Sequence, residues 1–317
     1  MTIQLGVVMD PITSINPKKD STLAMLLAAQ KRGWSLHYMT QNDLFMRDGI
    51  VYAHVKVLNV KNDVHDWFKF IGEKTIALHE LDVVLMRKDP PFDIEYIYTT
   101  HLLERAEQQG CLVINKPQAL RDVNEKLFTA WFAPCCPPTL VTRDRELLLA
   151  FVKEHEQAVL KPLEGMGGSA VFRLKQGDPN VNVVIEVLTH NSQRYIMAQR
   201  FIPAIAQGDK RILMINGKPV SHALARVPAS DDSRGNLAAG AQGEGRELTA
   251  RDRFICEQVG PTLRAKGLYF VGLDVIGDYL TEINVTSPTC IRELDALYNL
   301  DIAGDFIECV DTLLKQK

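Results

Sequence analysis

Short apolar runs alternate with amphipathic segments through the first third of the chain. Leu5–Met9 is an apolar run with the length of a buried strand. Asp20 and Ser21 favour the start of a helix and Gly33 favours its end, so we expect a helix that reaches Arg32. Further strands are expected at Trp34–Met39, Leu81–Met86 and Leu112–Asn115, and a second helix at Asp93–Gln109. This alternation predicts a three-layer α/β domain with a largely parallel sheet, spanning residues 1–122.

The pattern changes after residue 122. A helix is expected around Asn124–Phe132, and the prolines of Pro134–Pro138 predict a stiff connector behind it. Short apolar runs predict strands at Thr139–Val141, Val159–Lys161, Ala170–Arg173 and Ile196–Phe201, with a helix at Arg145–His155. These elements predict a small α+β domain over residues 123–203.

Hairpin signals dominate the rest of the chain. Asn216-Gly217 follows the apolar run Arg211–Ile215, and Gly277-Asp278 follows Leu268–Ile276. An Asn-Gly pair is the strongest short-range signal for a hairpin turn. Residues 204–317 are therefore expected to form a third, α+β domain.

Composition excludes several classes of protein. The 36 basic and 39 acidic residues give a net charge of −3, which does not drive a chain onto nucleic acid. No apolar run approaches the roughly 18 residues of a membrane span, and the first residues lack the features of a signal peptide. The six cysteines form no Cys-x-x-Cys pair, so free thiols are expected, with Cys135-Cys136 packed rather than redox-active. We expect a cytoplasmic globular protein without nucleic-acid or membrane partners.

A glycine cluster follows the strand that ends at Lys161. Gly165, Gly167 and Gly168 lack a Cβ atom, so their backbone N–H groups could wrap a phosphate. The spacing matches neither the Walker pattern nor a dinucleotide-binding fingerprint. A plain hairpin loop is the alternative, and the lysine at the strand end favours a nucleotide phosphate.

Asp274, Glu282 and Asn284 supply oxygen ligands on two neighbouring strands. Glu282 and Asn284 are two residues apart, so their side chains share one face. A two-residue turn would place Asp274 on the opposite face, whereas a three- or five-residue turn centred on Asp278 would place it across from Glu282. A solvent-exposed polar face is the alternative, but the apolar neighbours favour a buried pair of strands and hence a Mg²⁺ site.

Arg211, Arg226 and Arg234 are candidates for binding phosphate or carboxylate. Arginine holds such groups with two parallel hydrogen bonds. Arg234 lies in the segment Ala229–Gly245, which is too rich in Gly, Ser and Asp for a regular element. A loop of that length inside a compact domain is typical of a lid or binding loop, although a surface loop with incidental arginines is the alternative.

Six segments spread over nearly the whole chain carry a resemblance to a known family. They are Met9-Asp10-Pro11, Met86–Asp93, Asn115-Lys116-Pro117, Asn124–Leu127, Arg234–Gly240 and Thr281–Thr289. In these segments the chain resembles the bacterial glutathione synthetases of the ATP-grasp superfamily. The resemblance implies an ATP-grasp fold, with an N-terminal three-layer α/β (pre-ATP-grasp) domain, a small α+β lid domain and a C-terminal α+β domain.

The resemblance also implies an activity. It is the ATP-dependent ligation of γ-L-glutamyl-L-cysteine and glycine to glutathione, through an acyl phosphate, with release of ADP and phosphate. Mg²⁺ is the implied cofactor, with Mn²⁺ as an alternative ion, and a homotetramer is the implied assembly. The rival interpretations are another ATP-grasp ligase, such as a glutamate-adding or D-alanine–D-alanine type, and a non-catalytic ATP-binding module.

Site residues follow from the same resemblance. Lys126, Lys161 and the Gly165–Gly168 flap would contact the phosphates of ATP, and Asp274, Glu282 and Asn284 would hold the metal. Gln199, Phe201 and Ile202 would read adenine, and Asp209 would lie beside the ribose. Arg211 would neutralise charge during the reaction. The residues expected near the peptide substrate are Arg226, Arg234, Asn236, Ser287 and Thr289.

Overall fold

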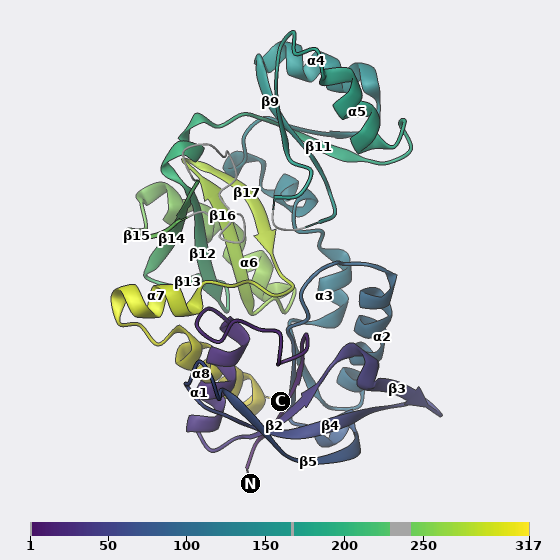
Figure 1. Cartoon of the computed structure of the whole chain (residues 1–317), viewed down its shortest axis with the longest axis vertical. Helices are drawn as coiled ribbons and strands as arrows, with labels where there is room; N and C mark the ends of the chain where they lie inside the picture. Colours follow the sequence, from purple (N-terminus) through teal and green to yellow (C-terminus); the bar gives the residue numbers. More distant parts are fainter. Residues whose placement is uncertain (1, 166–167, 229–241, 317) are drawn as a thin grey trace.

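The computed structural model describes residues 2–165, 168–228 and 242–316. Three sheets lie along the long axis of the molecule, and the N-terminal sheet is at one end (Figure 1). Among the described helices, none combines the length and the apolar character that a membrane span requires.

The first sheet has seven strands in the order β3-β4-β2-β1-β6-β7, with β5 paired to β4. Strands β1, β2, β6 and β7 are parallel, as predicted, but β3, β4 and β5 are antiparallel. The prediction of a largely parallel sheet therefore missed the extension between residues 44 and 77. The bounds are β1 Gln4–Val8, β2 Ser35–Met39, β3 Leu44–Arg47, β4 Ile50–Val60, β5 Phe68–Ala77, β6 Val83–Met86 and β7 Leu112–Ile114.

Helices of the first sheet begin where their capping residues predict. The side chain of Asp20 accepts from the backbone N–H of Leu23 at 2.6 Å and starts α1. Asp93 accepts from the N–H of Tyr96 at 2.9 Å and starts α2. A side chain that satisfies one of the free N–H groups of the first turn stabilises a helix by about 1 kcal/mol. The bounds are α1 Ser21–Lys31, α2 Ile94–Gln108 and α3 Pro117–Asp122.

The helix expected around residues 124–132 is instead a 3₁₀ segment, Leu127–Cys135. It is interrupted at Phe132, whose backbone is not helical, and it contains Pro134. Proline has no backbone N–H and cannot donate the hydrogen bond of a continuing α-helix. This segment leads to the second sheet.

The second sheet is antiparallel, in the order β10-β9-β11-β8, with α4 and α5 packed together on it (Figure 1). Helix α4 has the predicted bounds, but the sequence pattern did not predict α5. Its Val- and Ile-rich sequence favours a strand, yet Val184, Ile185 and Leu188 are buried along one helical face. The bounds are β8 Thr139–Thr142, α4 Arg145–His155, β9 Gln157–Pro162, β10 Phe172–Lys175, α5 Val181–Thr189 and β11 Ile196–Arg200.

The third sheet follows the order β15-β14-β12-β16-β17, with β13 paired to β12. Asn216 and Gly217 both have positive φ, as the predicted two-residue hairpin turn between β12 and β13 requires. The strands are β12 Asp209–Ile215, β13 Lys218–Pro219, β14 His222–Val227, β15 Gln242–Glu247, β16 Phe270–Ile276 and β17 Tyr279–Asn284. The helices are α6 Ala250–Ala265, α7 Ile291–Tyr298 and α8 Ile302–Lys315.

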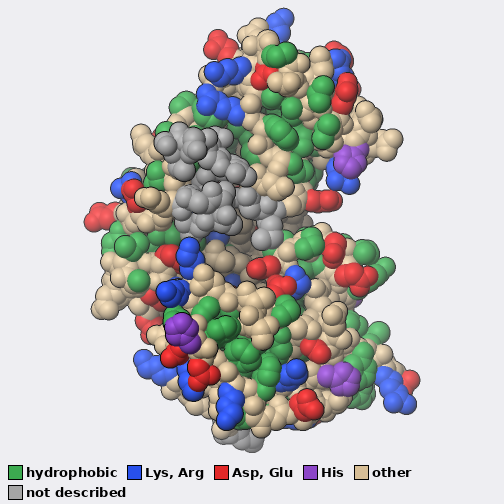
Figure 2. Space-filling view, in the orientation of Figure 1, with side chains coloured by type: hydrophobic (Ala, Val, Ile, Leu, Met, Phe, Trp, Pro, Cys, Tyr) green, Lys and Arg blue, Asp and Glu red, His purple; other side chains and the backbone are tan. Residues whose placement is uncertain are grey.

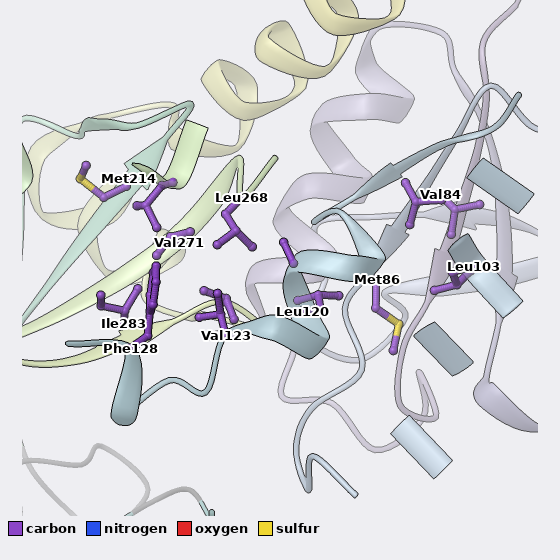
Figure 3. Packing of buried hydrophobic residues seen from close by; sticks show 14 of the residues in the cluster. Val84, Met86, Leu103, Leu120, Val123, Phe128, Met214, Leu268, Val271 and Ile283 are labelled. Atoms are coloured by element: carbon purple, nitrogen blue, oxygen red, sulfur yellow. The ribbon is translucent and has the colours of Figure 1, made fainter. Parts of the chain in front are cut away.

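Two hydrophobic clusters join the first sheet to the third. Figure 3 shows Leu120 and Val123 between Val84 of the first sheet and Val271 of the third. The other cluster packs α8 against α1 of the first domain and against β12 of the third sheet, so the C-terminal helix bridges the two. The second sheet has a cluster of its own. The core of the second sheet is therefore separate from the core that the other two share.

Candidate functional site

A cavity of about 340 Å³ lies between the second and third sheets, and residues before α2 also line it. Figure 2 shows an indentation at the waist of the molecule, below the part that contains the second sheet. Asp89 and Pro90, in the charged segment after β6, line the cavity. Every predicted site residue that the structure describes lies at this cavity. They are Lys126, Lys161, Gly165, Gly168, Gln199, Phe201, Ile202, Asp209, Arg211, Arg226, Asp274, Glu282, Asn284, Ser287 and Thr289.

The β16–β17 hairpin brings the three oxygen-bearing residues to one face. Asp274 pairs with Glu282 in register, and Gly272 pairs with Asn284. The turn has two residues, because Ile276 pairs with Tyr279, so neither turn length that would have produced this register is present. A β-bulge next to Asp274 supplies the extra residue instead.

Four buried charges alternate in sign below the cavity. Arg211 donates from Nε and Nη2 to the two carboxylate oxygens of Asp274, at 2.5 and 3.0 Å. Arg226 Nη2 lies 2.9 Å from Asp274 Oδ2 and donates to Asp209 Oδ2 at 2.5 Å. Each cation is thereby placed between or beside carboxylates, which is how buried charges are tolerated.

These contacts shift the ionisation of both carboxylates. Burial opposes ionisation of Asp274, but Arg211 and Arg226 outweigh it and hold the pKa of this carboxyl well below its usual range. Burial raises the pKa of Asp209 to about 7, although Arg226 counteracts it. Asp209 Oδ1 is buried and has no hydrogen-bond partner among the residues that the structure describes. A buried acceptor of this kind is ready for a donor on a ligand.

Two buried lysines face the β17 strand from different elements. Lys161, at the end of β9, places Nζ 3.3 Å from the carbonyl oxygen of Thr281. Burial lowers the pKa of Lys161 to about 8. Lys126 donates to the carbonyl oxygen of Gly165 at 2.9 Å and lies 3.0 Å from Glu282 Oε1. Lys126 therefore links the glycine-rich loop to the predicted metal strand.

The end of β11, the strand beside β9 in the second sheet, forms another wall of the cavity. The side chain of Gln199 is buried and donates to Thr139 Oγ1 at 3.2 Å. The guanidinium of Arg173 lies 3.7 Å from the ring centre of Phe201. This wall offers an apolar and aromatic surface, which suits a planar base.

The loop after β17 forms the remaining wall. Ser287 Oγ donates to the carbonyl oxygen of Arg87 at 3.3 Å, and Arg87 Nη2 donates to the carbonyl oxygen of Pro288 at 2.8 Å. Thr289 Oγ1 lies 3.8 Å from the buried thiol of Cys290. Gly167, Arg234 and Asn236 lie outside the described residues.

Comparison with known proteins identifies the family. The family model of the prokaryotic glutathione synthetase N-terminal domain matches residues 3–121, and that of the ATP-grasp domain of the same family matches residues 125–299. The chain belongs to the prokaryotic glutathione synthetase family. It is 59% identical over 317 residues to the glutathione synthetase of Pseudomonas putida, with all of both chains covered. It is 56% identical to that of Escherichia coli K12, with 99% of this chain and 100% of the relative covered.

Solved structures show the same fold at much lower identity. D-cycloserine synthetase DcsG has a TM-score of 0.68 at 15% identity, with 98% of this chain and 99% of that one covered. The ATP-grasp ligase PsnB, complexed with minimal precursor, Mg and ADP, has a TM-score of 0.63 at 16% identity, with 98% of each chain covered. The ATP-grasp fold is therefore confirmed. As a glutathione synthetase family member the chain is an ADP-forming ligase of glutathione synthesis, and the rival interpretations lose their basis.

The residues of this family member suit a phosphate-bound divalent cation. Among the described residues, Glu282 contacts Lys126 through Oε1 alone, and the amide nitrogen of Asn284 donates to the carbonyl oxygen of Gly272 at 3.2 Å. Within the described ranges, no group of three or more His, Cys, Asp or Glu side chains could hold a metal alone. Mg²⁺ is characteristically held by one or two carboxylates together with substrate phosphates. The donor set therefore fits Mg²⁺ that arrives with ATP.

Sequence reasoning missed some residues of the cavity wall. Glu125, Arg173, Thr281 and Cys290 all line the cavity. Glu125 and Thr281 stand inside the segments Asn124–Leu127 and Thr281–Thr289 that carried the family resemblance, and this was the available signal. Nothing in the pattern marks Arg173 or Cys290, because they reach the cavity through the packing of separate elements.

Proposed function

We propose that the cavity binds Mg-ATP, γ-glutamylcysteine and glycine and joins the cysteinyl carboxylate to the glycine amine. One observation carries this assignment: two buried lysines, two buried arginines and the Asp274–Glu282–Asn284 face meet in a single cavity. Such a site concentrates positive charge where phosphoryl groups are transferred and needs no covalent nucleophile of its own.

The nucleotide would lie along the second sheet. Gln199, Phe201 and Ile202 would contact adenine, and Asp209 Oδ1, which lacks a described partner, would accept from a ribose hydroxyl. Lys126 and Lys161 would bind the phosphates, together with the loop Gly165–Gly168. In that loop, Gly165 and Gly168 have φ of 95° and 74°, which side chains rarely adopt. Mg²⁺ or Mn²⁺ held by Asp274, Glu282 and Asn284 would neutralise phosphate charge.

The reaction proceeds in two steps. An oxygen of the cysteinyl carboxylate attacks the γ-phosphorus of ATP, and the bond to ADP breaks, which leaves an acyl phosphate. The uncharged amine of glycine then attacks the acyl carbon, and phosphate leaves while the amine loses a proton. Arg211 and Arg226, which line the cavity, would neutralise the charge that develops on the carboxylate and phosphate oxygens.

The peptide substrate would lie against the loop after β17. Arg226, Ser287 and Thr289 would contact it, as would Arg234 and Asn236. An acyl phosphate exposed to water hydrolyses, so the walls around the substrates must exclude water as well as orient the reactants.

We further propose that the protein is cytoplasmic and forms a homotetramer. Sedimentation of the purified protein would test the assembly.

The experiment measures ADP release by the purified protein with Mg-ATP and γ-glutamylcysteine, with and without glycine. Mass detection of the tripeptide accompanies it. Glycine-dependent ADP release matched one-to-one by glutathione supports the proposal. Retained ATP binding without turnover would refute the substrate assignment while leaving the nucleotide site in place.

A further inference from the structure

Three consecutive residues between α3 and the 3₁₀ segment contact three different parts of the site. Asn124 Oδ1 accepts from the N–H of Leu127 at 2.9 Å, and its Nδ2 donates to the carbonyl oxygen of Leu163 at 3.1 Å. Lys126 joins the glycine-rich loop to Glu282, as described above. Glu125, between them, is part of neither contact and has no role in the proposed reaction.

Glu125 instead holds the outer edge of β17. Its backbone carbonyl accepts from the N–H of Ile283 at 2.8 Å. Its carboxylate oxygen Oε1 accepts from the N–H groups of Val285 and Thr286 at 2.7 and 3.0 Å, and from Thr286 Oγ1 at 3.0 Å. β17 is the last of the described strands of its sheet, so no described strand lies beside these N–H groups. Glu125 takes the place of that strand.

Along β17 and just beyond it, the residues that Glu125 contacts alternate with the predicted metal ligands. The N–H of Ile283 points outward to Glu125, and backbone directions alternate along an antiparallel strand, so the backbone groups of Glu282 and Asn284 point inward to β16. Ile283 and Val285, which Glu125 holds, lie on either side of Asn284. Anchoring them restricts both the position of the strand and the direction in which the side chains of Glu282 and Asn284 point.

We propose that Glu125 is a positioning residue that orients Glu282 and Asn284 toward the metal. The inference rests on the proposed assignment of these two residues as metal ligands. A carboxylate suits the task because one oxygen accepts from three donors, and hydrogen bonds to a charged acceptor are about twice as strong as neutral ones. Without it, two N–H groups and one hydroxyl at the strand edge lose their acceptor.

The test compares Glu125→Ala, Glu125→Gln and Glu282→Gln with a matched control, Asp252→Asn. Asp252 is a fully buried carboxylate that also accepts from a backbone N–H, that of Thr249 at 2.9 Å, but it does not line the cavity. Mn²⁺ binding is titrated by electron paramagnetic resonance in the presence of a non-hydrolysable ATP analogue. Hydrogen exchange of the peptide 281–290 is followed by mass spectrometry.

Glu125→Ala is expected to raise the Kd of Mn²⁺ about tenfold, the usual effect of losing a group that orients metal ligands. Glu125→Gln is expected to raise it less, because its amide oxygen still accepts, and it carries the test should Glu125→Ala fail to fold. Both variants should speed exchange in 281–290. Asp252→Asn should change neither quantity, even if it unfolds at a lower temperature.

Three results would overturn the inference. If Glu282→Gln weakens Mn²⁺ binding while both Glu125 variants bind it like the wild type, Glu125 does not orient the ligands. The same conclusion follows if Asp252→Asn weakens binding as much as Glu125→Gln does, since the effect is then one of stability. If Glu282→Gln leaves Mn²⁺ binding unchanged, the metal assignment in the proposed function is wrong, and the inference falls with it.

Discussion

Replacing Arg211 with methionine should separate catalysis from stability when it is compared with the neighbouring residue. Arg211 and Lys210 are consecutive on β12, so they point to opposite faces of the sheet. Each contacts a buried carboxylate at 2.5 Å, Arg211 with Asp274 and Lys210 with Asp252. Only Arg211 lines the cavity. Lys210→Met is therefore a matched control for Arg211→Met.

The size of the effect on stability follows from the charges. Two unit charges about 4 Å apart attract by about 4 kcal/mol at an effective dielectric constant of about 20. Removing Arg211 leaves Asp274 with Arg226, which Asp209 already engages. Removing one partner of a buried pair lowers the free energy of unfolding by about 3–5 kcal/mol. We expect losses of this order in both methionine variants.

Activity should distinguish the two variants. At a temperature where both are folded, Arg211→Met should lower kcat about 10²–10³-fold, the usual effect of losing one group that stabilises transition-state charge. Lys210→Met should retain kcat. Urea unfolding and glycine-dependent ADP release measure the two quantities. Full kcat in Arg211→Met, or an equal loss in Lys210→Met, would refute the assignment of Arg211 to charge neutralisation.

Further predictions concern Lys161, Lys126 and the adjacent cysteines Cys135 and Cys136. Because the pKa of Lys161 is about 8, its ammonium group loses a proton above pH 8 in the free protein. When a phosphate is bound beside it, Lys161 keeps this proton. ATP affinity should fall about fivefold from pH 8 to pH 9 by calorimetry, and Lys161→Met should abolish this slope. Lys126→Met removes the contacts to Gly165 and Glu282, so ATP should bind about tenfold more weakly. Amide hydrogen exchange of the peptide 163–171 should be faster in this variant. Unchanged hydrogen exchange would contradict the proposal that Lys126 links the glycine-rich loop to β17. Burial raises the pKa of the Cys136 thiol to about 11, so iodoacetamide at pH 7.5 should alkylate it more slowly than it alkylates free cysteine. Mass spectrometry measures the alkylation. The variant Cys136→Ser should keep the ligase activity.

The local pattern predicted most elements of the fold, and its failures have physical causes. Asp20 and Asp93 start helices because capping depends on residues three positions apart. Helix α5 was missed because burial of one face outweighs the strand preference of its valines and isoleucine. The antiparallel extension β3–β5 was missed although Val51, Ala53 and Val55 alternate with Tyr52, His54 and Lys56 along β4. This period-two pattern predicts a strand, but it does not predict the strands with which β4 pairs.

The candidate site was predicted from residue types, and its geometry was not. The spacing of Glu282 and Asn284 places them on one face in any strand. Asp274 joins them only because a β-bulge shifts the register by one residue, and no turn rule predicts that bulge. Glu125 was overlooked because its contacts lie about 160 positions away in the sequence.

The sequence by itself determined the family and the reaction, and it predicted the chemical groups of the proposed metal and phosphate sites. Spacing, capping and turn residues act over a few positions, and motif residues keep their chemistry wherever they lie. Only the tertiary structure decided which of these groups meet and how each is charged. The pKa of Lys161, the pairing of Asp274 with two arginines and the hold of Glu125 on β17 all depend on burial and on distances between segments far apart in the chain.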